Sequence, residues 1–422
     1  MTATVLILIY CVIFAYLIRR LRFFEQTGLK TQLLLGLFGV KVTAGILYGF
    51  IHKNFFSGGD TFLYFAESQQ LAATFAEHPL YCLQSLFGFS ADIPSADVYL
   101  YPPAAIFWKD LGTYFIIHIN AALIPFSGGV YEVHVVFMAM LGTIASALLY
   151  KTLKSGLNLS NNLLITACFL LPSLLFWTAG IHKDVFLFFG LSLLMWSLHS
   201  RRWLGFGLGL LIMGLTRHYS LLLLCPALMG YFFAQSAPRF VGFKVLLAGA
   251  GGLFLLMLVD YHIFNNFIIN ILAQKQNAFI NETGSSDFRN LQPFDNYWGL
   301  ISQLPSAFSN VVARPLFWEF KHIWQLLAGV EMGFFWCFVL LMMLFPKQLQ
   351  YSPMAYFMLF FSLSYLLLIG FLVANEGTMV RYRAIPLSFL TILIWQATNW
   401  ATVQNWLSRW VGIRSDKFKL YP

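Results

Sequence analysis

The chain has 422 residues, of which 59% are hydrophobic and only 10% are charged, with a mean hydropathy of +0.72. A soluble domain carries about 25% charged residues, so the composition excludes a water-soluble globular protein. The net charge of +9 is interpreted as basic residues at cytoplasmic helix ends, and no nucleic-acid partner is expected. The composition therefore predicts an all-α polytopic membrane protein with a single membrane domain over residues 1–422.

Apolar stretches long enough to cross a membrane recur along the chain. Residues 104–126 could add a re-entrant or interfacial pair, so the prediction is about 11 transmembrane helices, within a range of about 10–13. Three segments between or after the spans are predicted to be a first large outer loop with interfacial helices at 52–130, a second outer loop at 264–322, and a cytoplasmic tail at 402–422. The predicted spans are 2–18, 31–51, 131–150, 163–181, 185–199, 203–216, 219–235, 244–263, 323–345, 352–374 and 384–401.

Basic residues fall in every second connection between these spans. Short connections rich in lysine and arginine face the cytoplasm, so the N-terminus is predicted outside and the C-terminus inside. The residues that set this orientation are Arg19, Arg20, Arg22, Lys30, Lys151, Lys154, Arg201, Arg202, Arg239, Lys347, Arg409, Arg414, Lys417 and Lys419.

Short polar clusters gather on the opposite, outer side. They are flanked by aromatic residues and stand at span ends, unlike ordinary solvated loops. The pattern favours one shared site over unrelated loop ends. The clusters are Asp60, "HKD" at 182–184, "TRH" at 216–218, "ARPLFWEFKH" at 313–322 and "NEGTMVRYR" at 375–383.

Asp60 follows Gly58 and Gly59, which permit a tight turn, and precedes a run with helical apolar spacing that includes Tyr64. This pattern predicts a helix lying in the membrane interface with the acid near its start. A simple N-cap aspartate is the structural alternative.

Two hairpin tips carry cations. Asp184 is placed to cap the next helix, which leaves Lys183 to meet an anion or to pair within the hairpin. Arg217 and His218 lie between short spans, and a charge near the bilayer centre costs about 2.5–3.5 kcal/mol, so a phosphate or an acidic partner is expected. Lys41, in the middle of a span, is predicted to face another helix.

The later clusters mix signs. Arg314 and Glu319 either pair with each other or join the site. Glu331, two turns into a span, needs a partner, and Arg314 and Arg381 are the candidates.

Arg381 and Arg383 flank Tyr382. In an extended stretch, residues two apart face the same side, so the two planar guanidinium groups could grip one diphosphate. The alternative is that they hold Glu376 and lipid headgroups.

The stretches "GGDTFLYFAE", "PSLLFWTAGIHKD", "LTRHY" and "RYR" before Pro386 resemble features of the GT-C superfamily of polytopic membrane glycosyltransferases and of O-antigen-polymerase-like proteins. The resemblance covers most of the chain in layout and implies a GT-C-like fold in a bacterial cytoplasmic (inner) membrane, with the active site on the periplasmic face. The sequence shows neither the large soluble C-terminal domain of oligosaccharyltransferases nor an evident two-acid metal motif.

The resemblance implies transfer of a sugar from a polyprenyl-phosphate donor to a glycan, lipid or protein acceptor, with inversion and with Asp60 as general base. Arg217, Arg381 and Arg383 would stabilise the phosphate, with Lys183 and His218 as second-choice donor-binding residues. The supporting residues are Tyr64, Asp184, Arg314, Glu319, Glu331, Glu376 and Tyr382.

Three questions stay open at the level of the sequence. A Wzy-like polymerase or ligase would rely mainly on the outer arginines, and a transporter or flippase would carry out no chemistry. A divalent metal, magnesium or manganese, could assist. Its ligands could be the outer-loop acids Asp92, Asp97, Glu282 and Asp287, although their spacing does not demand a metal.

Overall fold

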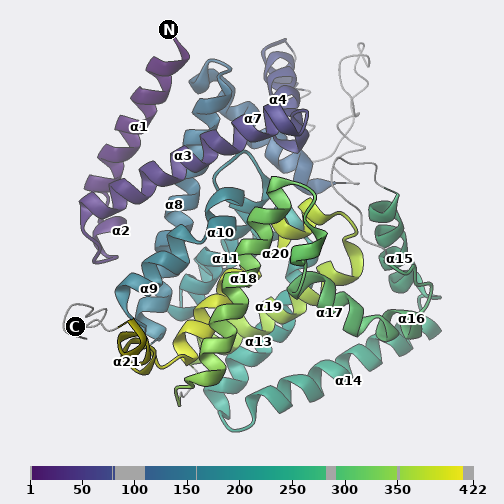
Figure 1. Ribbon diagram of the computed structural model, residues 1–422. Coiled ribbons are helices and arrows are strands. Elements are labelled where there is room, and N and C mark those ends of the chain that lie inside the picture. The colour runs from purple at the N-terminus through teal and green to yellow at the C-terminus, as the bar shows by residue number, and fades with distance from the viewer. Residues whose placement is uncertain are drawn as a thin grey trace. The chain divides into compact units, whose positions relative to one another are not determined.

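The computed structural model describes residues 2–77, 79–80, 110–157, 159–281, 291–348 and 352–411 (Figure 1). Within these ranges the regular elements are helices, and the strand-like pairing is limited to an isolated bridge between Pro346 and Thr398. The prediction of an all-α protein is confirmed for this part of the chain.

Seven helices in the described ranges are long and apolar enough to cross a membrane. The chain is therefore an α-helical membrane protein, while the predicted count of eleven spans stays a prediction. The seven are α1 (Ala3–Arg20), α3 (Thr31–Phe55), α8 (Tyr131–Gly156), α13 (Tyr219–Ser236), α14 (Val241–His262), α18 (Ile323–Leu344) and α19 (Pro353–Leu372).

The other helices are shorter or less apolar. They are α2 (Arg22–Glu25), α4 (Gly59–Glu77), α7 (Leu111–Ser127), α9 (Asn161–Ile165), a π-helix (Thr166–Leu170), α10 (Pro172–Trp177), α11 (Lys183–His199), α12 (Trp203–Arg217), α15 (Phe267–Ile280), α16 (Tyr297–Ser302), α17 (Leu304–Val312), a 3-10 turn (Phe317–Glu319), α20 (Glu376–Ala397) and α21 (Trp400–Val411).

Two predicted spans have different boundaries in the structure. The span at 163–181 is interrupted, because Leu171 leaves the helical conformation (ψ 126°) immediately before Pro172, as residues before proline tend to do. The last predicted span, 384–401, corresponds to the helix α20, which begins at Glu376 because the Asn375 side chain accepts a hydrogen bond from the Thr378 amide at 3.0 Å and caps the helix there; α20 is not among the seven helices above.

The chain forms two compact units, each described by itself. Unit 1 comprises Met1–Thr152, Cys168–Leu170 and Leu174–Leu222, and unit 2 comprises Leu153–Ala167, Leu171–Ser173 and Leu223–Pro422. The prediction of one membrane domain stays a prediction. The predicted loops at 52–130 and 264–322 contain α4, α7 and α15–α17, with residues 78, 81–109 and 282–290 outside the described ranges. The predicted tail at 402–422 is described to residue 411, within α21.

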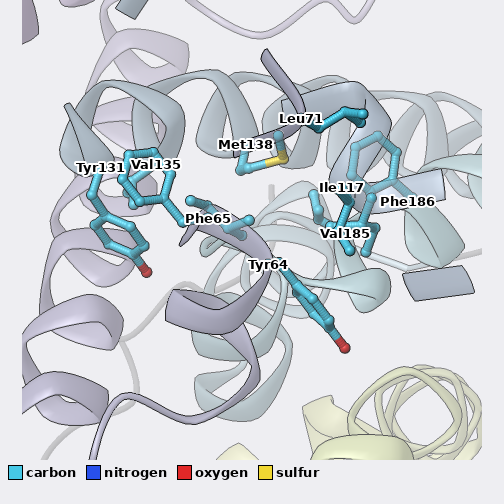
Figure 2. Close-up of a cluster of buried hydrophobic side chains, with 11 residues drawn as sticks. Tyr64, Phe65, Leu71, Ile117, Tyr131, Val135, Met138, Val185 and Phe186 are labelled. Atoms are coloured by element: carbon cyan, nitrogen blue, oxygen red, sulfur yellow. The ribbon is translucent and has the colours of Figure 1, made fainter. Parts of the chain in front are cut away.

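In unit 1, α4 packs along α7 and α11 packs along α12. Small residues permit the second contact, since a Cβ on Gly209 would lie 2.8 Å from the Gly190 carbonyl oxygen. Rings and aliphatic side chains from α4, α7, α8 and α11 form a buried cluster around Phe65 and Ile116 (Figure 2). This cluster fixes the face of α4 that carries Asp60.

In unit 2, α19 packs against α17 and α20, and α18 packs against α20. The buried Asp260 of α14 accepts hydrogen bonds from the amides of Ile268 and Ile269 at the start of α15 and from the Tyr297 hydroxyl of α16. These contacts tie three helices together through one carboxylate.

Candidate functional site

The turn between α10 and α11 presents His182 and is held by close backbone packing. A Cβ on Gly142 would lie 2.6 Å from the Thr178 carbonyl oxygen, and one on Gly45 would lie 2.6 Å from the Ala179 carbonyl oxygen. The third glycine, Gly180, lies against the Tyr48 ring. Because side chains at these glycines would collide with the turn, its position is set by the helices around it.

Lys41 supports the same turn from the interior of α3. It is 3% exposed, and its Nζ donates to Thr178 Oγ1 at 2.5 Å, while Thr178 Oγ1 donates to the Leu174 carbonyl oxygen. The prediction that Lys41 faces another helix is confirmed, because a Cβ on Gly142 of α8 would lie 2.6 Å from Lys41 Cε, while its hydrogen-bond partner Thr178 follows α10.

Asp60 stands in the first turn of α4. Gly58 and Gly59 have φ values of 94° and 57°, in the left-handed region that favours glycine, so the predicted turn before the helix is confirmed. The Asp60 side chain is 49% exposed, and its Oδ2 lies 3.7 Å from His182 Nε2. The acid is therefore open to solvent on one side and faces an imidazole on the other.

His182 is the first member of a line of charged groups that runs into the interior. It is fully buried, and its Nδ1 lies 2.6 Å from Asp184 Oδ2. Asp184 Oδ1 accepts a hydrogen bond from Arg217 Nη2 at 2.7 Å, and Arg217 Nη1 donates to the Tyr219 hydroxyl at 2.7 Å. The imidazole thus lies between two carboxylates, one buried and one half-exposed.

The sequence-based site left out His182 and Tyr219. The "HKD" stretch contains the relevant signal, because a histidine directly before a helix and an acid two residues later can share one side. Whether His182 contacts Asp60 depends on how the turn at 178–181 folds, and the sequence does not determine that fold.

Lys183 points to a different acid. Its Nζ donates to both carboxylate oxygens of Asp110 at 2.8 Å and lies 5.8 Å from the centroid of the Tyr64 ring. Asp110 also caps α7 by accepting from the Thr113 amide at 3.1 Å. Burial raises the pKa of Asp110, but the Lys183 charge and the hydrogen bonds outweigh it and hold that pKa below its usual value. The sequence did not single out Asp110.

Tyr64 joins the buried cluster to this polar group. Its ring belongs to the cluster, and Figure 2 shows its hydroxyl pointing away from the other labelled side chains. The ring centroid lies 6.2 Å from that of His182. Asp60 and Tyr64 are one helical turn apart, so α4 presents both on the same face.

In unit 2, Arg381 and Arg383 lie inside α20, so the expected extended stretch is wrong. Residues two apart in a helix point in different directions, and the two arginines accordingly differ in surroundings. Arg383 is 1% exposed and donates from Nη1 to the carbonyl oxygens of Val311 at 3.2 Å and Arg314 at 2.5 Å. Arg381 is half-buried, with its guanidinium carbon 5.0 Å from the Tyr382 ring centroid.

The acids of unit 2 have neighbouring partners. Arg314 Nε lies 3.2 Å from Glu319 Oε1, which confirms the mutual-pairing alternative for that stretch. Glu376 Oε2 accepts from Gln325 Nε2 at 2.8 Å.

Glu331 accepts hydrogen bonds from the backbone amide of Ser173, at 3.0 Å, and from its hydroxyl. The expected partners Arg314 and Arg381 are therefore wrong for this acid. An amide at the start of α10 and a hydroxyl satisfy it, because both are donors suited to a carboxylate.

Sorted by unit, the predicted residues fall into two groups. Unit 1 brings together Asp60, Tyr64, Lys183, Asp184 and Arg217, with His218 exposed at the end of α12. In unit 2, the segment at 314–325 contacts α20. The remaining predicted residues lie in this unit: Arg314, Glu319, Glu331, Glu376, Arg381, Tyr382 and Arg383.

The described residues include no group of three or more histidine, cysteine, aspartate or glutamate side chains arranged to hold a metal ion. The candidate ligands Asp92, Asp97, Glu282 and Asp287 lie outside those residues. Participation of a divalent metal stays a prediction.

Comparison of the chain with protein-family models, with curated proteins and with solved structures found no match. The functional argument therefore rests on the chemistry of the site. A half-exposed carboxylate next to a buried imidazole can accept a proton from a hydroxyl group, and the nearby cations can attract an anionic ligand.

Proposed function

We propose that the protein is a GT-C-type membrane glycosyltransferase that moves a sugar from a polyprenyl-phosphate donor to an acceptor hydroxyl on the outer face of the membrane. The observation that carries the proposal is the position of Asp60. It stands at the start of a helix after a glycine turn, open to solvent, with His182 at 3.7 Å and the ion pair of Asp184 and Arg217 behind it. A capping aspartate alone would need no such support.

The reaction follows from this geometry and from the resemblance of the sequence. The Asp60 carboxylate takes the proton of the acceptor hydroxyl as that oxygen attacks the anomeric carbon. The bond from that carbon to the phosphate oxygen breaks, and its electron pair leaves with the lipid phosphate. Attack from the face opposite the phosphate inverts the configuration at the anomeric carbon.

The cations proposed to bind the phosphate are Arg217, Arg381 and Arg383. Lys183 and His218 are the second choices in unit 1. A planar guanidinium offers paired donors to phosphate oxygens, where negative charge builds during the reaction.

The proposal also includes the finer topology: about eleven spans in a bacterial cytoplasmic membrane, the N-terminus outside, the C-terminus in the cytoplasm and the site on the periplasmic side. The alternation of basic connections along the sequence supports this orientation. The acceptor is a glycan, a lipid or a protein.

The test is transfer by the purified protein in lipid with a panel of polyprenyl-phosphate sugars. Asp60→Asn should lower the transfer rate about 10²–10⁴-fold, the usual contribution of a general base. Glu77→Gln, an acid-to-amide change at the exposed far end of α4, should leave the rate unchanged. Arg381→Ala should also lower the rate, with a higher KM for the donor.

The competing functions give different results in the same assay. Full transfer by Asp60→Asn together with loss in Arg381→Ala would support the polymerase or ligase. No turnover by the unaltered protein with any donor would reject the transferase, and lipid flux across the membrane would then be measured for a transporter or flippase.

A further inference from the structure

His182 is fully buried, and two carboxylates approach its ring. Nδ1 lies 2.6 Å from Asp184 and Nε2 lies 3.7 Å from Asp60, so opposite edges of one ring meet two acids. Both distances are within the range of an ion pair, and the first is a close contact.

Asp184 fixes which nitrogen of a neutral His182 carries the proton. Both carboxylates accept but do not donate, and Asp184 is the nearer one, so the single N–H of the neutral ring is assigned to Nδ1, toward Asp184, and the lone pair to Nε2, toward Asp60. Arg217 keeps Asp184 ionised in this role by pairing with its other oxygen at 2.7 Å. The lone pair of Nε2 thus faces the acid that we propose as the base.

The groups around the ring carry more negative than positive charge. The described groups around the ring include three carboxylates but only two permanent cations, so one proton on His182 brings the sum to zero. The groups that face it, directly or through one partner, are Asp60 and Tyr64 of α4, Lys183 and Asp184 of α11, Arg217 of α12, Tyr48 of α3 and Asp110 before α7.

We propose that Asp60 and His182 act as one base: Asp60 receives the acceptor's proton, and His182 Nε2 then takes it from Asp60. This rests on the proposed transferase function. An ordinary imidazole holds a proton about two and a half pH units more strongly than an ordinary aspartate, so the pair is a stronger base than a lone carboxylate.

The atoms and electrons balance through the step. The acceptor O–H bond breaks as its oxygen bonds to the anomeric carbon, and the phosphate leaves with the electron pair of the broken bond. The proton passes from Asp60 to Nε2, which leaves an imidazolium between two carboxylates. Asp60, being half-exposed, returns that proton to the outer solvent before the next turnover.

The first test needs no substrate. Full-length protein with ring-¹⁵N histidine in lipid bilayers is titrated by NMR, and His182→Gln identifies the signal by its disappearance. Neutral His182 should carry its proton on Nδ1. Asp60→Asn should move the midpoint of its protonation to lower pH by about one unit or more, because a neighbouring carboxylate favours the imidazolium. Glu77→Gln should not move it.

Equal midpoints in the unaltered protein and in Asp60→Asn would overturn the shared base, and so would a neutral form protonated on Nε2. The Asp60 side chain is half-exposed in the first turn of α4, so we expect the Asp60→Asn variant to fold and to allow this comparison.

The second test is the pH dependence of transfer. In His182→Gln, Asp60 is the lone base, so kcat should fall while the KM for the donor stays unchanged. In the plot of kcat against pH, the acidic limb should move to lower pH, toward the pKa of an ordinary aspartate. His199→Gln, the same change at the exposed far end of α11, should leave both unchanged. A fall in kcat without a shift of the limb would assign His182 a purely structural role and overturn the proposal.

The two tests separate the two proposals. Coupled titration without transfer by the unaltered protein would reject the transferase while the shared proton site stands. Transfer without coupled titration would reject the shared base while the transferase stands.

Discussion

Arg217 and Arg383 are buried to a similar degree, 4% and 1% exposed, yet they do different things. Arg217 in unit 1 pairs with the carboxylate of Asp184, which contacts an imidazole next to a half-exposed acid. Arg383 in unit 2 donates to the backbone carbonyl oxygens of Val311 and Arg314, at and just beyond the end of α17. The first arginine belongs to a line of charged groups that ends at the acid we propose as the base, and the second contacts a helix end. Burial of a cation therefore does not by itself indicate a functional site.

Removal of the Arg217 charge tests most directly whether the two buried arginines differ, and it should have the largest effect. Arg217→Met leaves Asp184 buried without its cation, and losing one partner of a buried ion pair costs about 3–5 kcal/mol of unfolding free energy. The measurement is unfolding by SDS titration in mixed micelles. Arg217→Lys, which keeps the charge, should recover part of the loss. A cost under about 1 kcal/mol for Arg217→Met would show that Asp184 does not depend on this pair.

Arg383→Met should cost less, about 1–3 kcal/mol, because it leaves neutral carbonyl oxygens without a donor rather than an unpaired charge. The same titration measures it. The midpoint of His182 protonation should stay where it is in this variant. Equal costs for the methionine variants of Arg217 and Arg383 would remove the distinction between the two sites.

Packing of the turn before His182 gives a third measurement. A Cβ at Gly45 would lie 2.5 Å from Val135 Cγ1 and 2.6 Å from the Ala179 carbonyl oxygen, so Gly45→Ala should cost about 1–2 kcal/mol after the gain in helix propensity. Gly39→Ala, on the same helix with open space around it, should be neutral or slightly stabilising. A neutral Gly45→Ala would show that the turn can move.

The smallest expected effect concerns Asp110. Its lowered pKa means that the pair with Lys183 stabilises the fold above the unfolded pKa of about 3.9, and that this contribution is lost as the pH falls through the lower folded value. Asparagine also caps helices, so Asp110→Asn isolates the pair with Lys183. Because Asp110 is half-exposed and solvent screens it, the cost near neutral pH should be about 0.5–1 kcal/mol.

That difference between Asp110→Asn and the unaltered protein should begin to shrink below about pH 3.9 and disappear only once the pH is below the lowered folded pKa of Asp110, where the unaltered side chain also becomes neutral. Thermal unfolding in detergent at several pH values measures it. A difference that persists unchanged in acid would assign the effect to the cap rather than to the charge.

The sequence by itself determined the class of protein, the place of most helices and the setting of Asp60. These follow from local rules: apolar runs long enough for a bilayer, and two glycines before a helical pattern. It also placed Lys183, Asp184 and Arg217 at the ends of short helices. Each of these inferences needs only residues within one or two turns of each other.

Tertiary structure decided which partner each polar group has. Asp184 meets Arg217 across 33 residues, Lys183 meets Asp110 across 73, and the imidazole of His182 meets Asp60 only because the turn after α10 is packed against α3 and α8. The tertiary structure also buries Arg383 of α20, where its guanidinium donates to the carbonyl oxygens of Val311 and Arg314. Such pairings depend on contacts between helices that are distant in the sequence. An arginine or lysine can donate to a carboxylate, a carbonyl or a phosphate, and the sequence alone does not indicate which of these it meets.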